Sequence, residues 1–121
     1  MNEGPVYSKS FDFALKIVSL FQQLVAQKEF ILSKQMLRCG TSIGANVNEA
    51  SAGQSKKDFI SKMAIASKEA RETLYWLRLL KESKIADIDY SDHMARCEES
   101  VRILTAIVKT SQAVLSLNTQ H

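Results

Sequence analysis

Residues 37–50 read LRCGTSIGANVNEA. The surrounding sequence indicates a helix, yet this stretch contains small residues that weaken a helix, and the reason for them bears on how the helices pack. Gly40 and Gly44 are four positions apart, and each glycine costs a helix roughly 1 kcal/mol relative to alanine. Because glycine has no side chain, another helix backbone can come close at both positions. The stretch is therefore predicted to pack tightly against a neighbouring helix.

A polar row runs along the same helix, directly beside its apolar side. At about 100° per residue the row spans an arc of only about 80°. Because this row borders the predicted core, we expect its side chains to hydrogen-bond to neighbouring segments and so to fix the register of the helices or the assembly of subunits. The alternative is that the row forms a ligand or nucleic-acid site. Its members are Gln35, Arg38, Ser42, Asn46 and Glu49.

Hydrophobic periodicity predicts four helices, at about residues 10–26, 33–52, 55–83 and 91–117. Ser10 is expected to cap the first helix, and Gly53 to adopt the left-handed conformation after the second. No proline follows Pro5, which favours long helices. Short connections make successive helices antiparallel. The fold class is all-α: one domain over residues 1–121, an antiparallel up-down-up-down four-helix bundle with left-handed packing.

The first helix carries two apolar stripes instead of one. A helix that is apolar on two sides normally has two neighbours. It is therefore either a central helix of the bundle or a helix with one stripe against another subunit. One stripe contains Phe13, Ile17, Leu20 and Leu24, and the other contains Phe11, Ala14, Leu15, Val18, Phe21 and Val25.

Arg38 and Glu49 are too far apart along one helix to pair with each other, so both need partners elsewhere. The second and third helices reverse direction near Gln54, which places Arg38 opposite Glu69. We expect an Arg38–Glu69 ion pair. Glu49 is expected to meet Lys62 or a basic residue of another chain.

The polar row also carries a family resemblance. The spacing of Gln35, Arg38, Ser42–Ile43, Ala45–Asn46 and Glu49, followed by Phe59 and by ASKEARETLYWLRLL at 66–80, resembles the four-helix-bundle family of 23S rRNA intervening-sequence proteins. That family is similar to the accessory protein of diversity-generating retroelements, a basic, barrel-shaped homopentamer that works with a reverse transcriptase and binds nucleic acid. The resemblance implies a homopentamer in the bacterial cytoplasm.

The net charge is +3, and basic residues concentrate in the third helix and its flanks. A non-enzymatic, homo-oligomeric accessory factor that binds RNA or DNA weakly and without sequence preference would use such residues on phosphates. A solvated mixed-charge face is the alternative, because Asp58, Glu69, Glu72 and Glu82 share the helix. A scaffold that binds another protein and no nucleic acid is the second functional hypothesis. The candidate contacts are Lys56, Lys57, Lys62, Lys68, Arg71 and Arg78.

Residues suited to catalysis or metal binding are sparse. His93 and His121 are the only histidines, and neither has partners at metal-ligand spacing. We therefore expect no catalytic residues, no metal and no cofactor, and predict that the protein is not an enzyme. Cys39 and Cys97 are expected to be reduced and buried. No apolar run suits a membrane span and no signal peptide is evident, so a cytoplasmic location is expected.

Overall fold

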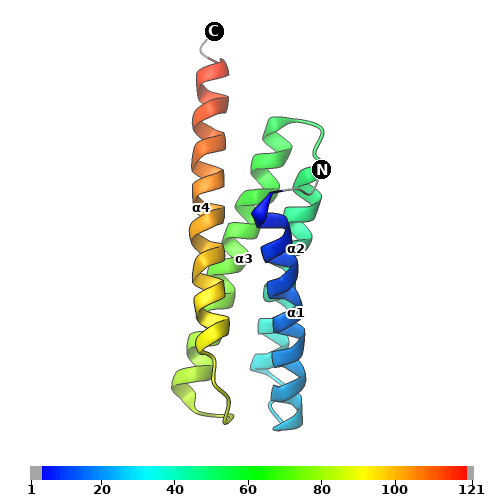
Figure 1. Ribbon diagram of the computed structural model, residues 1–121, viewed down its shortest axis with the longest axis vertical. Helices are drawn as coiled ribbons and strands as arrows, with labels where there is room; N and C mark the ends of the chain where they lie inside the picture. Colours follow the sequence, from blue (N-terminus) through cyan, green and yellow to red (C-terminus); the bar gives the residue numbers. More distant parts are fainter. Residues whose placement is uncertain (1–3, 120–121) are drawn as a thin grey trace.

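The computed structural model describes residues 4–119 and contains four α-helices. They are packed side by side (Figure 1), and each contacts its successor, while α1 also touches α4. No strand occurs within the described residues. The predicted all-α four-helix bundle is confirmed. The helices are α1 Pro5–Ala26, α2 Leu32–Ser51, α3 Lys56–Ser83 and α4 Ser91–Thr119.

The start of α1 differs from the sequence prediction. The helix begins at Pro5, with Gly4 as its N-cap, because a proline ring at the first helical position has the right φ and needs no hydrogen-bond acceptor. Ser10 is not a cap: it is buried inside α1, and its hydroxyl donates to the Tyr7 carbonyl at 3.1 Å. The other predicted boundaries agree with the structure to within two residues.

The left-handed positions also differ from the prediction. Gly53 does not have a positive φ; instead, Lys28 and Lys84, at φ 67° and 55°, end the turns after α1 and α3. Neither residue type signals this conformation in a sequence. The loop after α1 is further held by Gln27, whose side-chain amide donates to the Asp87 carbonyl at 3.0 Å and accepts from the Asp87 N–H at 2.8 Å.

The two stripes of α1 have different environments. The stripe formed by Phe13, Ile17, Leu20 and Leu24 is buried in the core. On the other stripe Phe11, Leu15, Val18 and Val25 are 64%, 56%, 40% and 36% exposed. Within one chain, α1 is therefore covered on one side only, and four large apolar side chains face outward.

The glycines of α2 lie where α1 comes closest. A Cβ atom built on Gly40 would be 2.9 Å from Cγ2 of Ile17, and one on Gly44 would be 3.2 Å from the Ser10 carbonyl oxygen. The first distance is shorter than real side chains tolerate and the second is tight. The predicted close packing at LRCGTSIGANVNEA is confirmed, and the neighbour it serves is α1.

Candidate functional site

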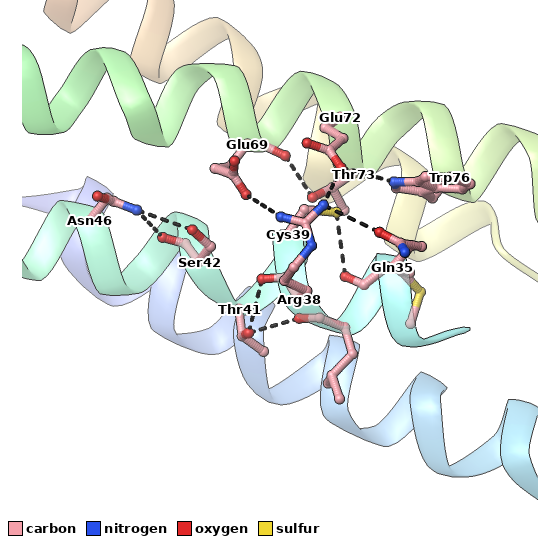
Figure 2. Close-up of polar contacts among 12 residues, drawn as sticks. Gln35, Arg38, Cys39, Thr41, Ser42, Asn46, Glu69, Glu72, Thr73 and Trp76 are labelled. Atoms are coloured by element: carbon pink, nitrogen blue, oxygen red, sulfur yellow. Dashed lines mark hydrogen bonds and ion pairs between the residues drawn. The ribbon is translucent and has the colours of Figure 1, made fainter. Parts of the chain in front are cut away.

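The polar row of α2 lies on the flank opposite these glycines, next to α3 (Figure 2). Arg38 is at its centre. Its guanidinium donates from Nη1 to Oε2 of Glu69 at 3.5 Å, from Nη2 to Oε1 of Gln35 at 3.4 Å, and from Nη2 to Oε2 of Glu72. The predicted Arg38–Glu69 pair is therefore present, and it belongs to a larger cluster that ties α2 to α3.

Glu72 is the stronger acidic partner of this cluster, and the sequence prediction missed it. Its carboxylate also accepts from the indole N–H of Trp76 at 3.2 Å. Hydrogen bonds from Trp76 and Arg38 hold the pKa of Glu72 below its ordinary value. Glu72 is one helical turn from Glu69 on α3, so a single guanidinium on α2 can reach both carboxylates, and this i, i+3 spacing was the available signal.

Burial is unequal across the cluster. The side chain of Glu69 is 10% exposed, that of Glu72 31% and that of Arg38 54%. Arg38 thus covers a nearly buried carboxylate from the solvent side. Removing the arginine would leave the Glu69 carboxylate desolvated without a cation, which is unfavourable.

The end of the row nearest the α2–α3 loop behaves differently. Asn46 bonds only within α2, where its amide donates to the Ser42 carbonyl at 2.9 Å and to the Ser42 hydroxyl at 3.1 Å. Glu49 is exposed, and among the described residues it forms no ion pair, so the expected contact with Lys62 is absent within one chain. Contact of Glu49 with another chain stays a prediction.

The charged residues of α3 are separated by sign around the helix. At about 100° per residue, Asp58, Glu69 and Glu72 fall on the side toward α2. The adjoining side, centred roughly 110° further round the helix, between the solvent and α4, is termed here the outer face of α3. Glu82, near its end, is its one acidic residue, and Lys68, at its edge, is only about 40° from Glu72. Its basic members are Lys57, Lys68, Arg71 and Arg78, all of them exposed.

Two of the six predicted nucleic-acid contacts lie off the outer face. Lys62 is half-buried on the α2 side, and Lys56 lies at the start of α3, with its ammonium group 6.0 Å from the centre of the Phe59 ring. The structure therefore brings four of the six candidates together and leaves these two apart.

The helix α4 adds a basic residue to the outer face. A surface groove between α3 and α4 is lined by Ala64, Ser67, Arg71, Thr105, Val108, Lys109 and Gln112. Gln112 also lines a second groove that continues to Lys57 at the start of α3. Arg71 is steadied in the first groove by donating to the Ser67 hydroxyl at 2.8 Å. Sequence reasoning missed Lys109, because only the α3–α4 register brings it next to Arg71.

The thiols have no reactive setting. Cys39 and Cys97 are free and buried. Burial raises the pKa of Cys39, and it raises that of Cys97 to about 12. A thiol with such a pKa is almost wholly protonated at neutral pH and is a poor nucleophile.

Within the described residues there is neither a metal-binding cluster nor a helix suited to a membrane. In the described part of the chain, no three His, Cys, Asp or Glu side chains are grouped so that they could hold a metal ion. None of the helices within residues 4–119 combines the length and apolarity that a membrane crossing requires.

Comparison with known proteins agrees with this architecture. A crystal structure of a protein of unknown function from the S23 ribosomal protein family of Bacteroides thetaiotaomicron is 48% identical, with a TM-score of 0.82, over 86% of this chain and 98% of that chain. No match was found among curated proteins. The family model for the 23S rRNA-intervening sequence protein matches residues 2–106. The chain therefore belongs to the 23S rRNA-intervening sequence protein family.

Proposed function

We propose that this protein is a non-enzymatic homo-oligomer that binds the phosphate backbone of nucleic acid, without sequence preference, through the outer face of α3. The observation that carries the proposal is the separation of charge around that helix. Arg38 holds Glu69 and Glu72 at the α2–α3 seam. Lys68, one turn before Glu72, also interacts with that carboxylate, but Arg71 and Arg78 lie further round the helix from it.

The chemistry of the outer face suits phosphates better than base edges. Lys57, Lys68, Arg71, Arg78 and Lys109 are flexible cations spread along two helices. Such side chains follow a charged backbone and carry no base information.

One aromatic ring lies among these cations. Tyr75 is 59% exposed and is one helical turn from both Arg71 and Arg78. Its ring packs edge-on against that of Trp76, with 5.2 Å between the ring centroids. A ring held in this way can stack on any base. Such stacking would let the protein contact single strands without sequence preference.

Self-association is the second part of the proposal. The exposed stripe of α1, with Phe11, Leu15, Val18 and Val25, is a continuous apolar surface of the kind that marks protein interfaces. The resemblance to the retroelement accessory protein implies five copies. In such a ring the modest basic face of one subunit would be repeated, and weak phosphate contacts would add up.

The test is a matched pair of charge reversals on the same helix. Lys68→Glu with Arg71→Glu alters the outer face, whereas Lys56→Glu with Lys62→Glu changes net charge equally but off that face. We expect the first pair to weaken binding of a fluorescent single-stranded RNA by roughly tenfold or more, and to flatten its dependence on salt. The second pair should change binding by less than about twofold.

Two results would contradict this function. Equal loss of affinity in both variant pairs would mean that net charge, and not the outer face, governs binding. No binding by the wild-type protein at roughly 50 mM salt, where phosphate contacts are strong, would favour the scaffold hypothesis, with the α1 stripe as its protein-binding surface.

A further inference from the structure

The helix α4 continues well past the end of α1. The ion pairs Lys9–Glu99, at 2.7 Å, and Lys16–Asp92, at 3.1 Å, set an antiparallel register between the two helices. In this register Pro5, the first residue of α1, is level with Ile103. The last sixteen residues of α4, to Thr119, are therefore beyond α1, roughly 24 Å of helix at 1.5 Å per residue. Figure 1 shows this end of α4 rising above the other helices.

The side of α4 that faces α1 changes character where α1 ends. Beside α1 this side carries Asp92 and Glu99, which pair with the lysines of α1. From the level of Pro5 onward, steps of three and four along the same side lead to Ile103, Ile107, Thr110, Val114 and Leu117. We call these five residues the α4 stripe. Ile103 and Ile107 are half-buried against the core of their own chain, whereas Val114 and Leu117 are 40% and 58% exposed. The stripe is therefore open at its far end, where another helix could pack.

We propose that a second copy of this chain supplies that helix: two chains meet head to head, and their α4 stripes pack against each other antiparallel. A helix in the place of α1 would run antiparallel to α4, as α1 does. Two α4 helices related by a twofold axis between them are antiparallel in the same way. Lys109 is the one charged residue between Ile103 and Leu117, and it lines the groove with α3 instead of the stripe, so two stripes can approach without like charges between them.

The positions along the α4 stripe match themselves under this twofold axis. With the axis at Thr110, Ile103 lies opposite Leu117 of the second copy, and Ile107 comes within one residue of its Val114. Apolar residues thus meet apolar residues, and the two threonines meet at the centre. Residues that line the groove with α3, such as Gln112 and Leu115, are on the other side of α4, so each copy keeps α3 away from the contact.

Most of the stripe lies beyond residue 106, where the match to the family model ends. The contact is independent of the α1 surface proposed above for self-association. If α1 stripes assemble a ring, head-to-head contacts double it into a closed two-layered assembly. Each head-to-head contact is small, but the contacts made by all the copies in a ring would strengthen one another.

The first experiment is mass determination by light scattering at several concentrations. We expect the wild type to contain an even number of copies, Val114→Glu to contain half that number, and Gln112→Glu, on the other side of the same helix segment, to match the wild type. Circular dichroism should show all three to be equally helical. A Val114→Glu variant with wild-type mass, or a wild type with an odd number of copies at every concentration, would overturn the proposal.

A cysteine cross-link gives an independent readout. Thr110→Cys places a thiol on the twofold axis, where mild oxidation should join two chains, while Lys109→Cys should remain a single chain under the same treatment. The native thiols are buried and should not interfere. Absence of cross-linking at position 110, or equal cross-linking at both positions, would refute the antiparallel contact. Neither result would affect the α1 surface or the binding of nucleic acid.

Discussion

At the scale of single residues, Glu29 shows how a buried charge can be stabilised chiefly by backbone N–H groups. It is 5% exposed, and its carboxylate accepts from the N–H groups of Ile31, Leu32 and Ser33 at 2.9, 3.0 and 2.5 Å. These are the unpaired donors at the start of α2, where the helix dipole also favours a negative charge. Burial alone would raise the pKa of Glu29, but the backbone hydrogen bonds together hold it below its ordinary value.

This arrangement predicts a pH-dependent contribution to stability. Because the pKa of Glu29 is lowered by folding, its charge stabilises the protein above the ordinary glutamate pKa of about 4.3, and this contribution is lost as the pH falls through the folded-state value. Glu29→Ala should cost about 1–2 kcal/mol at pH 7. The deficit should shrink toward pH 3 in urea titrations. The exposed carboxylate Glu98 is the control, and a pH-independent deficit for Glu29→Ala would contradict the assignment.

At the scale of helices, the approach of α1 to α2 depends on Gly40. Gly40→Ala should gain roughly 1 kcal/mol of helix propensity but drive its Cβ into Ile17, whose Cγ2 and Cγ1 would be 2.9 and 3.0 Å away. Since Ile17 is fully buried, we expect a net loss of about 1–3 kcal/mol from overpacking.

A double-mutant cycle isolates this contact. Ile17→Ala removes Cγ1 and Cγ2, the two atoms that Gly40→Ala crowds most, so the two changes together should cost clearly less than the sum of their separate losses in free energy of unfolding. Gly44→Ala, which meets the Ser10 carbonyl oxygen instead, serves as the comparison, because Ile17→Ala cannot relieve it. Strict additivity between Gly40→Ala and Ile17→Ala would show that the glycine does not set the helix spacing.

Helices and their neighbours were largely predictable from the sequence, because period and chain reversal are local properties. The reversal near Gln54 was enough to place Arg38 opposite Glu69. Its second carboxylate partner, Glu72, required knowing how far a guanidinium reaches across the seam. The sequence also contains the separation of acidic from basic residues on α3, which appears when each residue is placed around the helix at 100° per residue. The prediction missed it because it considered the charges of the helix as one group.

Other features depended on information that no single segment holds. Lys109 joins Arg71 only through the register of α3 against α4. Both stripes of α1 have similar hydrophobicity, so only the packed structure shows that the stripe containing Ile17 is buried and the stripe containing Leu15 is exposed. The left-handed residues Lys28 and Lys84 have no signature in sequence, since glycine and asparagine are the usual residues there.

At the scale of the whole molecule, this chain of 13.6 kDa has exposed apolar side chains gathered on two helices. Among the described residues, four of them lie on the α1 stripe around Leu15 and two on the α4 stripe around Val114, while others, such as Ile31 and Ile65, lie elsewhere. Two contacts of different symmetry are therefore available to one chain, and each should be separable by mutation.

The final prediction concerns the α1 stripe. Leu15→Glu with Val18→Glu puts two charges in its centre, and desolvating them in an interface would be strongly unfavourable. We expect this variant to stop at the small assembly that α4 alone supports, two copies by light scattering, and to retain the helical circular dichroism of the wild type. Adding Val114→Glu should then give monomers. Gln23→Glu with Ser19→Glu, which adds the same charge to α1 outside the stripe, should leave the wild-type mass unchanged. A full-sized assembly in the Leu15 and Val18 variant would show that α1 is not the surface that joins the subunits, even if the α4 contact holds.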